Sequence, residues 1–62
     1  MQVTYRDRTW IFDKRLSVTQ MLRRISVLPE SVLVVQNGQL VTEDQHLNPG
    51  DTIKVVAVIS GG

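Results

Sequence analysis

The sequence predicts an α+β domain in which a small sheet packs on a single helix. Three observations point to this class: a hairpin pattern at the start, one amphipathic helical stripe near the middle, and β-branched segments in the second half. The chain has 62 residues, which is the length of one domain. We therefore expect residues 1–62 to form a single unit.

The first two segments predict an antiparallel hairpin. Residues 3–6 alternate apolar and polar side chains, as a half-buried strand does, and residues 9–12 are β-branched and aromatic. The polar link between them is short, so the two strands are expected to be neighbours.

A helix is predicted over residues 18–26. Ser17 has a capping side chain, and Gln20, three residues later, can complete a capping box. Pro29 is expected to prevent any continuation. Apolar residues recur at a spacing that places them on one helix face: Val18, Met21, Leu22 and Ile25.

The second half begins with a predicted hairpin. Residues 31–36 give the strongest strand pattern in the chain. Asn37-Gly38 gives the strongest turn signal, because both residue types tolerate positive φ. Residues 39–41 can then pair back as a short strand.

A polar loop and a last strand follow. Residues 42–51 are polar, with Leu47 as their one apolar anchor. Residues 52–59 are β-branched and predict a strand. Residues 59–62 are expected to form an extended, flexible tail.

The alternation of side chains along the last strand predicts which face of the sheet is exposed to solvent. Thr52 and Lys54 share one face, so the opposite set, which begins with Ile53, is expected to pack on the helix. Apolar side chains are then left on the outer face, which is typical of a partner site. Two alternatives stay open: both faces are covered, or the register is shifted by one residue. The predicted partner-binding patch is Leu33, Val35, Lys54, Val56, Val58, Ile59 and Ser60.

Composition excludes several classes of protein. The net charge of +1 gives no strong attraction to nucleic acid or membranes, so no direct nucleic-acid partner is expected. The chain has no cysteine, and therefore no disulfide framework or thiolate metal site. No apolar stretch approaches the ~20 residues that cross a bilayer, and the start has no signal-peptide pattern. A cytoplasmic protein is the expectation.

Basic residues are unevenly placed. Six of the seven lie between Arg6 and Arg24, whereas four of the six acidic residues lie from Glu30 onward. The common explanation is a solvated basic face. The alternative is a docking face for a partner, or for RNA that a partner holds.

Other chemically capable residues are interpreted as structural or surface residues. His46 has only Glu43 and Asp44 as near acidic neighbours and makes a poor metal site. Trp10 is expected to pack against the core or an edge. No catalytic residue, metal or bound cofactor is expected. Asp7, Asp13 and Asp51 give no spaced carboxylate pair suited to acid–base catalysis. Lys14 and Lys54 could accept conjugation, but they are interpreted as ordinary surface lysines.

Three segments resemble one protein family. Residues 33–41 (LVVQNGQLV), 48–53 (NPGDTI) and 58–62 (VISGG) are similar to the sulfur-carrier family of ubiquitin-like proteins, the ThiS, MoaD and TtuB type. The resemblance implies a ubiquitin-like β-grasp fold: a mixed sheet of four to five strands packed on one helix, in the order β-β-α-β-(β)-β. Residues 32–62 carry the sequence signal, and the first half matches in element order only.

The resemblance also implies a function that is carried by Gly61 and Gly62. A ubiquitin-activating-type enzyme would use ATP to adenylate the Gly62 carboxylate, and a sulfur donor such as a cysteine desulfurase or rhodanese would convert it to a thiocarboxylate. That group would supply a downstream sulfur-accepting synthase in thiamin or molybdopterin biosynthesis, or in tRNA thiolation, to which the tail is slightly more similar. The chain would be a protein co-substrate and not an enzyme. Two alternatives stay open: a modifier joined through Gly62 to lysines on targets, and a non-conjugating interaction module.

The residue types at the end of the chain suit this chemistry. An α-carboxyl with a pKa of ~3.3–3.7 is ionised at neutral pH and is a poor electrophile, so it must be activated. The sequence has no Gly-rich loop followed by Lys and Ser or Thr, so a partner must supply the activation. Glycines lack Cβ and can enter a narrow channel, and residues 58–62 reach at most roughly 17 Å.

Overall fold

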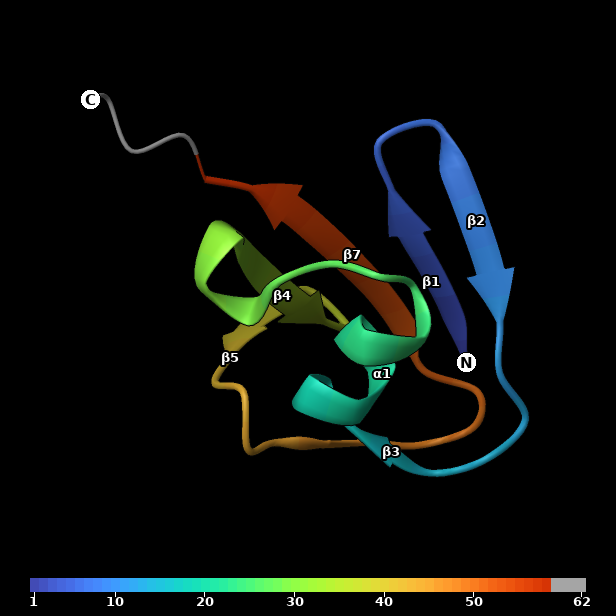
Figure 1. Ribbon diagram of the computed structural model, residues 1–62. Helices are drawn as coiled ribbons and strands as arrows, with labels where there is room; N and C mark the ends of the chain where they lie inside the picture. Colours follow the sequence, from blue (N-terminus) through green and yellow to red (C-terminus); the bar gives the residue numbers. More distant parts are fainter. Residues whose placement is uncertain (59–62) are drawn as a thin grey trace.

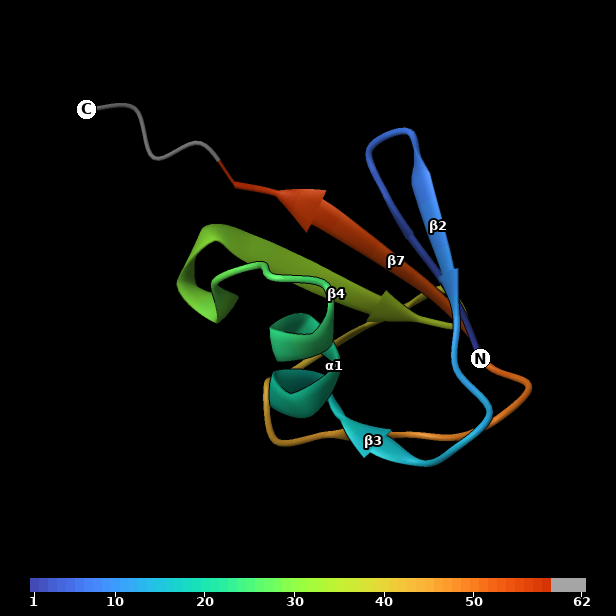
Figure 2. The same cartoon turned by 45° about the vertical axis from the view of Figure 1, so that its right-hand side comes forward.

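Within residues 1–58, a five-stranded sheet carries one α-helix on one face (Figures 1 and 2). The computed structural model describes residues 1–58, so the expected tail, residues 59–62, lies outside the described part. The sheet has the order β2-β1-β7-β4-β5, and it is mixed because β1 and β7 are parallel whereas the other neighbours are antiparallel. This arrangement confirms the predicted α+β class and the β-grasp architecture. The elements are β1 (Gln2–Tyr5), β2 (Arg8–Ile11), β3 (Leu16–Ser17), α1 (Val18–Arg24), the 3-10 helix η1 (Pro29–Ser31), β4 (Val32–Gln36), β5 (Gln39–Val41), β6 (His46–Leu47) and β7 (Thr52–Ala57).

The predicted first hairpin is confirmed. Strands β1 and β2 are antiparallel, and Tyr5 lies opposite Arg8, so the connection is the two-residue turn Arg6-Asp7. Arg6 has φ +57°, a conformation that tight hairpin turns require and that glycine or asparagine adopts more easily.

The helix begins as the sequence predicts. The Ser17 hydroxyl accepts a hydrogen bond from the Gln20 amide (3.1 Å), and the Gln20 side chain accepts one from the Ser17 amide (3.0 Å). The next two amides, of Val18 and Thr19, donate to the carbonyls of Gln45 (2.9 Å) and Glu43 (3.1 Å) in the later loop. The first turn of the helix is therefore fully hydrogen-bonded and anchored to residues 42–51.

The helix ends earlier than predicted, at Arg24 instead of residue 26. The Ser26 amide donates to the Arg23 carbonyl (3.2 Å) and the Val27 amide to the Leu22 carbonyl (2.9 Å). This pair of hydrogen bonds, with Ser26 at φ +61°, is a Schellman termination in which serine occupies the usual glycine position. Pro29 does not continue the helix and instead opens η1, since its fixed φ suits a first helical position.

The second hairpin is confirmed as well. Asn37 and Gly38 have φ of +50° and +85°, the signs that a two-residue hairpin turn needs, and Gln36 lies opposite Gln39. The predicted anchor Leu47 is fully buried. A small β3–β6 ladder, which was not predicted, places Leu47 opposite Leu16.

The core lies between α1 and the inner face of the sheet. Ile53 and Val55 of β7 are buried, as the alternation predicts, and so are Val32 and Val34 of the neighbouring strand β4. The strand β7 ends at Ala57 and is shorter than the predicted strand, whose last residue lies outside the described part. The full set of buried residues is Met1, Val3, Leu16, Val18, Met21, Leu22, Ile25, Val32, Val34, Leu47, Ile53 and Val55.

Candidate functional site

The outer face of the sheet carries exposed apolar side chains over its β7 and β4 strands. Leu33 lies opposite Val56, and Val35 lies opposite Lys54. Leu33 is 47% exposed, Val56 is 40% exposed and Val58 is 45% exposed. The structure therefore brings together the described members of the predicted patch on one face; Ile59 and Ser60 lie outside the described residues.

One further member of this surface was missed by the sequence analysis. Leu40 in the edge strand β5 lies opposite Val35 and is 64% exposed. The signal was present in the sequence, because a two-residue turn at Asn37-Gly38 fixes the pairing of every residue on either side. We call the surface formed by Leu33, Val35, Leu40, Val56 and Val58 the outer-face patch.

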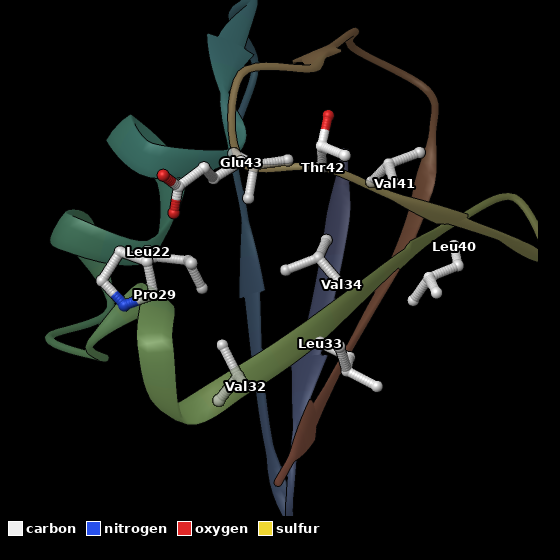
Figure 3. Close-up of a pocket in the computed structure, with 10 residues that line it drawn as sticks. Leu22, Pro29, Val32, Leu33, Val34, Leu40, Val41, Thr42 and Glu43 are labelled. Carbon is white, nitrogen blue, oxygen red and sulfur yellow. The ribbon is translucent and has the colours of Figure 1, made fainter.

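An apolar groove continues this patch around the β5 edge of the sheet (Figure 3). The groove has a volume of about 420 Å³ and lies between α1 and the strands β4 and β5. Leu33 and Leu40 line the groove and also belong to the outer-face patch. The carboxylate of Glu43 extends toward Leu22 and Pro29 at one side of the groove. The apolar surface is thus one continuous band with an acidic group at its margin.

The strands under the patch are tied together by Asp51. Its carboxylate accepts hydrogen bonds from the Asn48 amide (2.9 Å) and from the side chains of Gln36 (2.8 Å) and Asn37 (3.1 Å). The Asn37 side chain in turn accepts one from the Thr52 amide (2.8 Å). These bonds, that from the Asn48 amide above all, hold the pKa of Asp51 below its ordinary value. Asp51 thus joins the β4–β5 turn to the start of β7 and acts as a structural carboxylate.

The other candidate residues lie apart. His46 is exposed in β6, Trp10 is half-buried against the core, and Lys14 is exposed. Lys54 is also exposed, but it lies on the outer face of the sheet opposite Val35. Asp7 and Asp13 lie in two separate connections, before and after β2. In residues 1–58, no three metal-ligating side chains lie together, and no helix is both long and apolar enough to cross a membrane.

The patch adjoins the strand that leads to the last residues of the chain. Val56 belongs to β7, and the Val58 amide donates to the Ser31 carbonyl (2.9 Å), which keeps residue 58 beside the start of β4. Figure 1 shows β7 directed toward the margin of the molecule at the end of the sheet shared with the β1–β2 turn. Gly61 and Gly62 lie outside the described residues, four positions or fewer beyond this point.

Two comparisons with known proteins agree with this geometry. Residues 2–62 match the ThiS family. The fold is similar to the crystal structure of the thiamine biosynthesis protein (ThiS) from Geobacter metallireducens, with a TM-score of 0.70 and 25% sequence identity over 100% of both chains.

Proposed function

The chain belongs to the ThiS family of sulfur carriers, and we propose that it bears the transferred sulfur as a thiocarboxylate on Gly62. The observation that carries this proposal is the outer-face patch, an exposed apolar surface on the strand that leads to Gly61 and Gly62. Such a surface suits a partner that must hold the domain while it acts on the end of the chain.

The proposed chemistry needs three steps, all performed by partners. In the first, a Gly62 carboxylate oxygen attacks the α-phosphorus of ATP, pyrophosphate leaves, and an acyl-adenylate forms. In the second, the terminal sulfur of a persulfide on a cysteine desulfurase or rhodanese attacks the acyl carbon and AMP leaves, which gives an acyl disulfide. In the third, a thiol attacks the donor's sulfur in that disulfide, the Gly62 thiocarboxylate leaves, and the thiol and the donor cysteine end joined as a disulfide. Activation is required because an ionised carboxylate is a poor electrophile at neutral pH.

The adenylating enzyme is proposed to dock on the outer-face patch. Residues 58–62 span at most roughly 17 Å when extended, so the domain can remain outside while Gly62 reaches an enclosed site. The two terminal glycines suit a narrow entrance because they have no side chains. In this proposal the chain is a protein co-substrate, and ATP is bound by its partner.

The proposed destination of the sulfur is thiamine biosynthesis. The similar protein from Geobacter metallireducens is named a thiamine biosynthesis protein, and the family match is to ThiS. This supports the thiamin pathway over molybdopterin synthesis and over tRNA thiolation, to which the tail sequence alone is slightly more similar. A downstream sulfur-accepting synthase of that pathway would then be the acceptor.

Adenylation can be tested by exchange of labelled pyrophosphate into ATP. The chain is incubated with the source organism's ubiquitin-activating-type enzyme, ATP and labelled pyrophosphate. We expect exchange that depends on the chain and disappears when Gly61 and Gly62 are deleted. Exchange that is unchanged by the deletion would mean that Gly62 is not the activated group.

A further inference from the structure

A second hollow lies on the side of the molecule away from the apolar groove. It has a volume of about 410 Å³ and lies between the β1–β2 turn and the chain that follows α1. One wall comes from Tyr5, Arg6, Asp7, Arg8 and Trp10, and the other from residues 25–27. Neither the proposed carrier chemistry nor the outer-face patch uses this hollow.

Basic residues line one wall of the hollow and directly precede the other wall in the sequence. Arg6 and Arg8 line it, and Arg23 and Arg24, both exposed, occupy the helical turn directly before residue 25. The guanidinium of Arg6 lies over the Tyr5 ring at 5.3 Å from its centre, a cation–π contact that favours one position of the charge. Two arginines and one acidic residue, Asp7, line the hollow, so its lining carries a net positive charge.

Unfavourable backbone conformations concentrate at the same place. Three non-glycine residues in residues 1–58 have positive φ, and two of them, Arg6 (+57°) and Ser26 (+61°), lie on opposite walls of the hollow. The third is Asn37, which tolerates this conformation. Glycine would suit the backbone better at position 6. An arginine in place of glycine in this strained conformation points to a role for its side chain.

The mixed lining indicates the chemistry of an occupant. Tyr5, Trp10, Ile25 and Val27 offer apolar surface, while the arginines offer donors that match carboxylates. A net charge of only +1 gives little of the long-range attraction that nucleic-acid binding depends on. We propose that this hollow docks an acidic protein segment, in which an apolar side chain enters the hollow and flanking aspartates or glutamates pair with Arg6 and Arg8.

The hollow is also close to the outer-face patch. Arg6 lines a shallow depression on the outer face together with Lys54 and Val56. Because β1 and β7 are parallel, the β1–β2 turn lies at the same end of the sheet as the end of β7. A partner that covers the outer-face patch can therefore contact the basic hollow at the same time.

The test is an NMR titration of the isotopically labelled protein with a synthetic peptide in which leucine is flanked by glutamates. We expect amide shifts at residues 5–8 and 25–27 that diminish at high salt. The variant R6E/R8E should weaken the peptide Kd about tenfold, the loss expected when two exposed ion pairs become like-charge contacts. The matched control K14E/R15E reverses two charges in the connection between β2 and β3 and should change the Kd less than about twofold.

Three outcomes would overturn the proposal. These are no saturable shift with the peptide, equal weakening in both double variants, and tighter binding of an octauridylate RNA than of the peptide at the same sites. The variant R6G removes the arginine side chain and relieves the backbone strain at position 6. The melting temperature of the domain should therefore not fall, whereas the affinity for the peptide should. The titration requires neither ATP nor Gly62, so its result is independent of the proposed sulfur chemistry.

Discussion

Removing the two leucines shared by the outer-face patch and the apolar groove should separate partner binding from folding. Leu33 and Leu40 are 47% and 64% exposed. A docked partner can bury only this exposed part of each residue. Complete burial of a leucine side chain contributes about 1.5–3 kcal/mol, so covering both remaining fractions contributes roughly 1.5–3 kcal/mol in total. The variant L33A/L40A should therefore bind the adenylating enzyme about 10- to 100-fold more weakly.

The assay is isothermal titration calorimetry of the enzyme with the wild type and each variant. Ile11→Ala is the matched control, because Ile11 is 66% exposed and lies in β2, at the opposite edge of the sheet. We expect the control to change Kd less than about twofold. Circular dichroism at the assay temperature establishes that each variant is folded. Equal affinity of L33A/L40A and the wild type would refute docking on this surface.

Three further predictions concern the fold that supports the patch. Leu47→Ala should reduce the free energy of unfolding by about 2–5 kcal/mol in urea denaturation, because the side chain is fully buried against a core of limited size; a loss below about 1 kcal/mol would show that the loop is not anchored there. Ser26→Gly should raise the free energy of unfolding by about 0.5–1 kcal/mol, since glycine adopts φ +61° without a Cβ clash, and a decrease would contradict the assigned helix termination. Because the pKa of Asp51 is lowered in the folded protein, its carboxylate stabilises the fold. This contribution to the free energy of unfolding is fully present above the pKa that Asp51 has in the unfolded chain, and it is lost as the pH falls through its folded pKa. Thermal melts from pH 6 to about pH 3 should therefore show a smaller acid-induced decrease for Asp51→Asn than for the wild type or the control Asp13→Asn, and parallel curves would exclude this role.

Local patterns were sufficient to predict much of this fold. The Ser17 and Gln20 pair predicted the start of the helix because a capping box is formed by residues three positions apart. The alternation of Ile53 and Lys54 predicted the buried and exposed faces of β7, because successive strand residues point to opposite sides. Both features depend on contacts between near neighbours, which the sequence displays directly.

Of the features that were missed, the β3–β6 ladder depends on contacts between distant segments. The β3–β6 ladder joins Leu16 to Leu47, and neither two-residue strand has a pattern of its own. The helix ends at Arg24 because Ser26 adopts positive φ. A glycine at this position would have predicted the helix end from the sequence, whereas a serine does not. Leu40 was missed although the two-residue turn at Asn37-Gly38 fixes its pairing with Val35.

The carrier site was predictable in part. The described members of the patch lie on one face, as the alternation predicted, although their role in binding a partner stays a prediction. The positions of Ile59, Ser60, Gly61 and Gly62 lie outside the described residues. The concentration of basic residues between Arg6 and Arg24 indicated a basic surface. The hollow itself was not predicted, because its two walls come from segments that only the fold brings together.

Intact-mass spectrometry of the untagged protein is the most direct test of the central claim. The chain is incubated with the adenylating enzyme, ATP and a sulfur donor, and a second sample lacks ATP. The proposal predicts a species in which one oxygen is replaced by sulfur, located on Gly62 by fragmentation and present only with ATP. A product in which Gly62 is joined to a lysine of another protein, or an unchanged mass while AMP is released, would contradict the carrier function.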